Sequence, residues 1–219
     1  MSSRIVRHGA VRLALHRLRE GDERVRLLLL HEADGSAAEL AVPPWEGEVW
    51  ALDFTGHGDS SAPSGGGLSA EILLSDVDAA LQEIGPSTLW GFGLGAYIAL
   101  LTAAAAPESV RGVVLSAGRG LAGGGPEPQP LDRSPSVQLA ALRGAELLRA
   151  EAVADVRPPG YAKLLVRQAR ELGAGRLSVD ERLRGEAGEI PWLQAVIDSD
   201  GVRCEPASLA LAEAARIGG

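Results

Sequence analysis

Short, unbroken apolar runs recur along the first half of the chain, and each is followed by a polar or glycine-containing segment. Such runs are typical of strands that are covered on both faces of a sheet. They predict strands at residues 25–30, 49–52, 88–90 and 112–115. Before them, short apolar stretches on either side of His8-Gly9 predict an antiparallel hairpin, with strands at 5–7 and 11–15.

Between the later strands, apolar positions recur at helical spacing and predict helices at 69–84 and 97–105. Strands that alternate with helices form a mostly parallel sheet with helices on both faces. Residues 118–135 are rich in glycine and proline, and the remainder has a helical pattern without a convincing buried strand. Further helices are expected at 137–154, 161–172, 179–184, 192–197 and 207–216.

The predicted architecture is a single α/β domain over residues 1–219, with about six strands including the hairpin. Residues 1–120 would form the sheet core, 121–135 a linker, and 136–219 a helical cap or C-terminal region. The last strands of the sheet are expected to be missing, so the strand at 112–115 would be an open edge. Because an open edge must be covered, homodimerisation is one hypothesis.

Composition narrows the possible partners and the possible compartment. The net charge of −8 argues against nucleic acid and against an anionic membrane surface. The early arginines, between Arg4 and Arg26, alternate with apolar residues and are interpreted as the solvated face of the hairpin. The single cysteine excludes an internal disulfide, and no secretory signal or membrane-spanning stretch is evident. We therefore expect a soluble, cytoplasmic protein.

The segment Trp90-Gly91-Phe92-Gly93-Leu94-Gly95-Ala96-Tyr97 lies between a predicted strand and a predicted helix. Small residues on both sides of a central position are the frame of a nucleophile elbow. In the G-x-S-x-G form of this motif, a sharp strained turn pushes the central serine out over the sheet. Gly93 occupies that central position here.

Three motifs, in order, resemble those of the α/β-hydrolase family over roughly the first 120 residues. The run Leu27-Leu28-Leu29-Leu30-His31 resembles the strand that ends in the family's His-Gly oxyanion loop, and residues 53–60 resemble its D-x-x-G-x-G-x-S turn. The elbow at Gly93 is the third. The resemblance implies an α/β-hydrolase fold, and a reaction in which a serine attacks an acyl carbon with the help of a histidine and a carboxylate.

The chain departs from this pattern at each catalytic position. Gly93 has no side chain, and the family's histidine, which follows the last strand, has no counterpart because His57 is the last histidine. Glu32 stands where the family usually has glycine, and a carboxylate there would repel an oxyanion. Residues 196–200 could be a vestige of the seventh strand with its acid, although a helix end with exposed carboxylates is favoured.

The sequence thus predicts a degenerate family member without Ser-His-Asp hydrolysis, which binds a small apolar ligand under its cap or binds a protein. We expect no metal and no cofactor. Lys163 is the only lysine, so a lysine after a glycine-rich phosphate loop is excluded. The expected pocket and oxyanion region consists of His31, Glu32, Asp34, Phe92, Gly93, Leu94 and Tyr97.

Other readings stay open. The chain could be a weak esterase, or it could catalyse proton transfer, elimination or isomerisation, with Leu94 N–H as an oxyanion donor and His31, Glu32, Asp34 or Tyr97 as acid or base. His31 is otherwise a buried, hydrogen-bonded loop residue, and His57 braces a turn. Finally, Gly91-x-Gly93-x-x-Ala96 fits a dinucleotide fingerprint, and Arg119 after the next strand could meet the 2′-phosphate of NADP.

Overall fold

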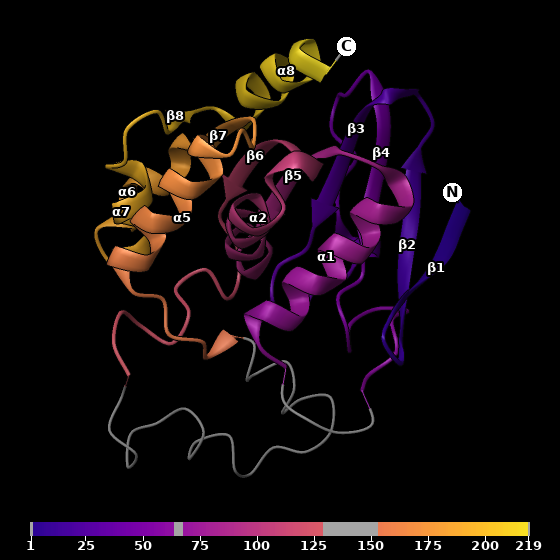
Figure 1. Cartoon of the computed structure of the whole chain (residues 1–219), viewed down its shortest axis with the longest axis horizontal. Helices are drawn as coiled ribbons and strands as arrows, with labels where there is room; N and C mark the ends of the chain where they lie inside the picture. The colour runs from indigo at the N-terminus through magenta and orange to yellow at the C-terminus, as the bar shows by residue number, and fades with distance from the viewer. Residues whose placement is uncertain (1, 64–67, 129–152, 219) are drawn as a thin grey trace.

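The computed structural model describes residues 2–63, 68–128 and 153–218. In these ranges eight strands form one sheet, in the order β1-β2-β4-β3-β5-β6-β7-β8 (Figure 1). β1 (Ser2–His8) and β2 (Val11–Arg19) form the predicted antiparallel hairpin, whose turn contains Gly9 with φ +58°. Arg4, Arg7 and Arg12 are exposed on it, as expected for a solvated face.

The centre of the sheet is parallel, as the unbroken apolar runs predict. β3 (Asp22–Leu30) lies between β4 (Gly47–Leu52) and β5 (Ser87–Phe92) and is parallel to both. β6 (Val110–Ser116) continues the parallel order next to β5. All four predicted buried strands are therefore confirmed, and their carboxyl ends meet at one edge of the sheet.

Helices cover both faces of the sheet, each over its own apolar cluster. α1 (Ala70–Ile84), α2 (Leu94–Ala105) and α5 (Pro159–Glu171) contribute to the larger cluster. On the other face, α8 (Ala207–Gly218) packs against β3 and β6, in a smaller cluster that includes Leu27 and Val114. The short α6 (Arg184–Ala187) and α7 (Pro191–Ile197) follow α5 in the chain, and α7 packs against α5.

The sheet does not end at β6, so the expectation of about six strands and missing last strands is wrong. β7 (Arg176–Asp180) pairs in parallel with β6, and β8 (Arg203–Glu205) pairs with β7. These strands have no long apolar run, and their existence depends on pairing with neighbours rather than on local pattern. The helix expected at 179–184 is replaced by the end of β7 and a 3-10 turn, Glu181–Leu183. Because β6 is paired on both sides, it is not an open edge, and the reason for expecting a dimer no longer applies.

The remaining helix predictions have mixed outcomes. The helices expected at 161–172, 192–197 and 207–216 are present as α5, α7 and α8. α7 ends at Ile197 and leaves Asp198 and Asp200 exposed, so residues 196–200 are a helix end and not a strand with an acid. The helix expected at 137–154 falls almost wholly outside the described residues.

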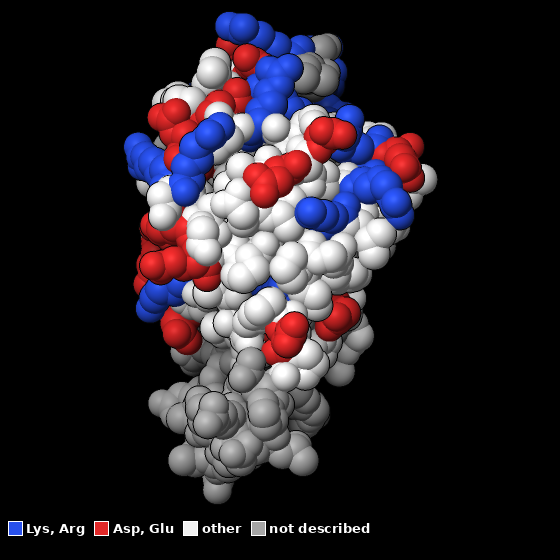
Figure 2. All heavy atoms as spheres, turned by 90° about the vertical axis from the view of Figure 1, so that its left-hand side faces the viewer, with Lys and Arg blue, Asp and Glu red and all other residues white. Residues whose placement is uncertain are grey.

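The molecular surface carries charges of both signs. On the face in Figure 2, basic and acidic side chains are interspersed towards the top and the sides, and a broad area between them holds few charged groups. This face therefore does not present the continuous basic surface that a phosphate backbone would require. Within the described parts of the chain, none of the helices combines the length and the apolar character that crossing a bilayer demands.

Candidate functional site

The turn at Gly93 has the geometry of a nucleophile elbow. β5 ends at Phe92, α2 begins at Leu94, and Gly93 between them has φ 54° and ψ −115°. The neighbouring glycines permit close backbone approach, because a Cβ at Gly95 would lie 2.5 Å from Leu30 O and one at Gly91 would overlap the backbone of Gly95. The predicted strand-to-helix bend is therefore present, with a conformation that L side chains adopt only under strain.

The backbone just after β6 folds back over this elbow. We refer to residues 117–121 as the plug. Its Arg119 carbonyl oxygen accepts hydrogen bonds from Leu94 N at 2.9 Å and from Ala33 N at 3.1 Å. In α/β hydrolases, the oxyanion hole is made by the N–H after the nucleophile and by an N–H from the loop after the third strand. The Arg119 carbonyl thus occupies the position where those two N–H groups would meet an oxyanion.

The plug also occupies the space into which a side chain at position 93 would project. A Cβ on Gly93 would lie 2.5 Å from the Gly118 carbonyl carbon and closer still to the Arg119 oxygen. Backbone atoms cannot give way as the end of a flexible side chain can. The plug in this position therefore requires glycine at 93, and a serine would have to displace it.

Glu32 holds the plug from one side. Its Oε2 accepts a hydrogen bond from Arg119 N at 2.7 Å, and its Oε1 accepts one from Arg119 Nε at 2.8 Å. Burial raises the pKa of Glu32, but these hydrogen bonds outweigh burial and leave the pKa below its ordinary value of 4.5. The carboxylate that was expected to repel an oxyanion instead fixes the segment that fills the oxyanion position.

We refer to the two hydrogen bonds between Glu32 and Arg119 as the latch. The latch predicts an acid-sensitive contribution to the free energy of unfolding. A carboxylate whose folded pKa is depressed stabilises the fold above its unfolded pKa, and that stability is lost as the pH falls through the folded pKa. Glu32→Gln should therefore be slightly less stable than the parent at pH 7, and the difference should shrink as the pH falls below 4.5. Urea unfolding of both proteins from pH 3 to pH 7 measures it, and a pH-independent difference would contradict the latch.

Arg157 holds the C-terminal end of the plug, and nothing in the sequence pattern marks it. Its side chain is 1% exposed, and Nη1 donates to Gly120 O at 2.7 Å and to Leu121 O at 2.6 Å. Its guanidinium carbon lies 4.1 Å from the centre of the Tyr97 ring, and Trp192 Nε1 also donates to Leu121 O, at 2.8 Å. Burial lowers the pKa of Arg157 to about 10, so the group is still a cation at neutral pH.

His31 is engaged at both ring nitrogens. Phe54 N donates to Nε2 at 3.2 Å, so the ring proton is on Nδ1, which donates to Glu32 O at 2.7 Å. Burial lowers the pKa of His31 to about 4, and the ring is neutral at pH 7. His57 packs 5.0 Å from it, and its Nδ1 contacts Thr55 O at 3.0 Å. This geometry favours a buried loop residue and a turn brace over an acid or base.

The other expected pocket residues do not converge on one space. Tyr97 packs edge-on against Trp192, at 5.2 Å between ring centroids, and burial raises its pKa to about 12. Asp34 is exposed and has φ +58°, whereas Phe92 turns to the α8 side of the sheet and packs against Trp90. Acid–base chemistry by His31, Glu32, Asp34 and Tyr97 together gains no support from this arrangement.

Asp180 is the carboxylate that the sequence analysis missed. It ends β7, where the resemblance places the family's triad acid, and it is 7% exposed. Its Oδ1 accepts a hydrogen bond from Arg182 N at 3.2 Å, and Ser116 Oγ lies 3.5 Å from Oδ2. Pro206 follows β8, so no histidine stands there. The alternation of apolar Leu177 and Val179 with polar residues in the sequence was the available signal for this strand.

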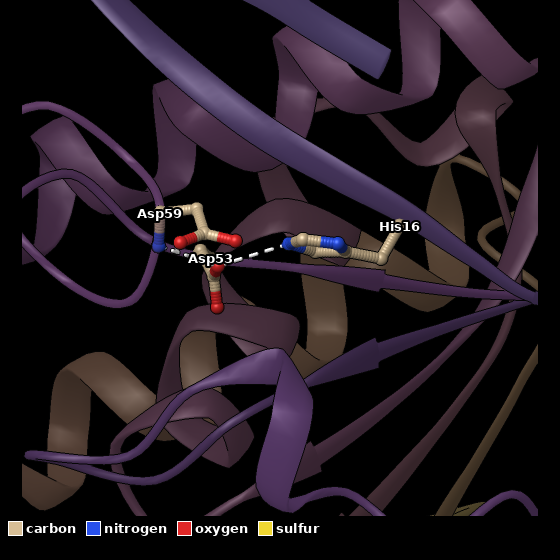
Figure 3. A group of neighbouring side chains, drawn as sticks. All are labelled: His16, Asp53 and Asp59. Atoms are coloured by element: carbon tan, nitrogen blue, oxygen red, sulfur yellow. Dashed lines mark hydrogen bonds and ion pairs between the residues drawn. The ribbon is translucent and has the colours of Figure 1, made fainter. Parts of the chain in front are cut away.

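A second carboxylate, Asp53, organises the turn at residues 53–60 (Figure 3). Its Oδ2 accepts hydrogen bonds from His16 Nε2 at 3.0 Å and Asp59 N at 2.9 Å, and its Oδ1 accepts one from Ala37 N at 2.6 Å. Ligand-type atoms of His16, Asp53 and Asp59 lie within 4.8 Å of one another, as in a cation site. Because both Asp53 oxygens already accept protein N–H groups, the cluster is explained as a brace of the turn.

The NADP interpretation conflicts with the position of the plug. A dinucleotide would place its pyrophosphate at the N-terminus of α2. There the Leu94 N–H is already bonded to the Arg119 carbonyl, and the Arg119 guanidinium pairs with Glu32 instead of facing an open site. The structure therefore offers no support for this reading.

Solved structures with the same arrangement come from several sources. A hypothetical protein, PA1622, from Pseudomonas aeruginosa PAO1 has a TM-score of 0.63 and 17% identity, over 99% of this chain and 98% of that one. The thioesterase domain from the curacin biosynthetic pathway has a TM-score of 0.59 and 15% identity, over 100% and 98%. An alpha/beta hydrolase from Sphaerobacter thermophilus DSM 20745 has a TM-score of 0.59 and 15% identity, over 100% of both. At these identities the likeness is one of fold.

The sequence comparisons are consistent with that fold. No curated protein matches the sequence. The sequence profile of the alpha/beta hydrolase family, in contrast, matches residues 17–213, which include every strand from β3 to β8. The chain therefore belongs to the alpha/beta hydrolase family.

Proposed function

We propose that this chain is a non-hydrolytic member of its family, a protein that binds a small ligand rather than cleaving an ester. One observation carries the proposal: the carbonyl oxygen of Arg119 accepts hydrogen bonds from both Leu94 N and Ala33 N. Removing a single oxyanion-hole donor costs a hydrolase about 10²–10³ in rate. Here both donors are engaged by the chain's own backbone.

The missing catalytic groups support the same conclusion independently. A serine nucleophile needs a base to accept its proton. Position 93 is glycine, and no histidine follows His57 in the sequence. His31, the first residue after β3, uses both ring nitrogens in backbone hydrogen bonds. A nucleophile, a base and a vacant oxyanion hole would all have to be supplied before hydrolysis could proceed.

Short-chain p-nitrophenyl esters test this proposal. We expect the parent protein to release p-nitrophenolate at the rate of buffer alone, and Gly93→Ser to do the same, because a hydroxyl without a base remains unactivated. An active member of the family, assayed in parallel, verifies that these esters are hydrolysed under the assay conditions. Circular dichroism establishes whether the Gly93→Ser variant is folded.

Saturable turnover by the parent protein would contradict the proposal. It would mean that the plug moves aside in solution and that a nucleophile other than residue 93 acts. This test uses the parent protein alone, so its outcome counts even if Gly93→Ser fails to fold.

A further inference from the structure

A cavity of about 540 Å³ lies on the α8 side of the sheet, at the carboxyl ends of β5, β6 and β7. It adjoins the elbow through Phe92 and the plug through Ala117, but Gly93, Leu94 and Arg119 do not line it. Its walls are largely apolar, and the rings of Trp90 and Phe92 pack there with centroids 4.7 Å apart and a tilt of 40°. Pro43, Pro44 and Leu211 complete the apolar lining. In open α/β sheets, the carboxyl ends of the strands are where ligands bind, and a volume of this size suits a small organic molecule.

One wall of this cavity is the buried carboxylate of Asp180. A carboxylate withdrawn from water normally pairs with a cation or accepts several hydrogen bonds. In the described parts of the chain no cation pairs with Asp180, and Oδ2 has only the long 3.5 Å contact with Ser116 Oγ. That hydroxyl already accepts a hydrogen bond from Trp90 Nε1 at 2.8 Å. Asp180 is thus a strong acceptor beside an apolar cavity, with capacity to accept a further donor.

The other charges around the cavity leave a negative balance. Glu181 and Arg182 are exposed and of opposite sign, so solvent screens them and they largely offset each other. The N-terminus of α8 contributes about half a positive charge, which only partly opposes a full carboxylate charge. The indole face of Trp90 also attracts a cation. The polar end of the cavity therefore favours a cationic donor over an anion.

We propose that this cavity binds a small organic amine, with its protonated nitrogen at Asp180 and its apolar or aromatic body against Trp90 and Phe92. This inference rests on the proposed function, since a ligand of the protein needs a site away from the occupied elbow. The triad acid of the family, left without a histidine, here serves as the counter-ion of a ligand.

Three probes of matched shape test the proposal: phenethylamine, 2-phenylethanol and 3-phenylpropionate. Tryptophan fluorescence reports binding, because Trp90 is the partly exposed tryptophan and the other three are buried. We expect saturable binding of phenethylamine, binding of the alcohol weaker by on the order of tenfold, and no binding of the carboxylate. Equal or tighter binding of 3-phenylpropionate would overturn the proposal.

Variants locate the site. Asp180→Asn keeps an acceptor for Arg182 N but loses the charge, and it should weaken phenethylamine binding by on the order of tenfold while leaving the alcohol unchanged. Asp198→Asn, at an exposed helix end, is the matched control and should change nothing. Ala207→Leu fills the cavity and should abolish binding of both probes. Unaltered amine binding in folded Asp180→Asn would overturn the assignment.

The two proposals fail separately. Amine binding is read by fluorescence and hydrolysis by release of p-nitrophenolate. If the amine does not bind, the cavity assignment is wrong and the absence of hydrolysis stands. If the parent protein turns over esters, the proposed function is wrong whatever the fluorescence shows.

Discussion

Gly93→Ala is expected to lower the free energy of unfolding by about 2–5 kcal/mol. A non-glycine residue with positive φ costs about 1–2 kcal/mol, and overpacking against a rigid neighbour adds about 1–3 kcal/mol. Both apply at Gly93, where φ is 54° and the plug backbone lies against the new methyl group. Urea unfolding, followed by circular dichroism, measures the loss.

Gly9→Ala is the matched control, because Gly9 has φ +58° but a Cβ there would meet no described residue within 4 Å. It carries the backbone strain without the collision, so we expect a loss of only about 1–2 kcal/mol. The excess at Gly93 then measures how firmly the plug is seated. If the two variants lose the same stability, the plug yields freely and does not determine the residue at 93.

Arg157→Ala is expected to destabilise the protein by about 3 kcal/mol. The substitution removes both hydrogen bonds to the plug carbonyls, leaves Gly120 O without this donor, and opens a gap beside the Tyr97 ring. Working against this, Nε and Nη2 of Arg157 have no hydrogen-bond partner among the described residues, so removing the cation also relieves a desolvation cost. We expect the loss of these hydrogen bonds and of the packing to outweigh the relief of the desolvation cost.

Arg157→Met separates these contributions, because it keeps most of the packing and removes the charge. It should lose about half as much stability as Arg157→Ala, with both measured by urea unfolding. Arg167→Ala, on the exposed face of α5, is the control and should lie within about 0.5 kcal/mol of the parent. A stabilised Arg157→Met would show that the buried cation costs more than its hydrogen bonds contribute.

The parts of this fold that the sequence predicts are those encoded locally. The unbroken apolar run before His31 and the glycines around Gly93 specify a strand and a sharp turn within a few residues. β7 and β8 are not predicted by local patterns, because they are short and are stabilised by pairing with neighbouring strands. β8 has only three residues, and its Glu205 accepts hydrogen bonds from Arg176 and from Ser178 Oγ at 2.7 Å.

The candidate site was predictable only in its framework. Gly93, Leu94 and Glu32 were expected near the oxyanion position, but the group that fills it was not. Main-chain carbonyls are present at every residue, so no residue type predicts the hydrogen bonds from Ala33 N and Leu94 N to the Arg119 carbonyl. Arg157 is likewise invisible in the sequence, because its role follows from long-range contacts with carbonyl oxygens. Asp180 was not predicted as a site residue because the strand that it ends, β7, was not predicted.

The atom that closes the oxyanion position belongs to the peptide unit, and this limits how substitutions could give the chain the hydrolytic chemistry of the Ser-His-Asp mechanism. Every amino acid at position 119 would bring the same oxygen, so substitution there changes the latch but not the obstruction. Reopening the hole would take a different loop length or path after β6, together with a side chain at 93 and a base near β8. No single substitution supplies all three, so under the proposed function we expect no point mutation alone to give ester turnover.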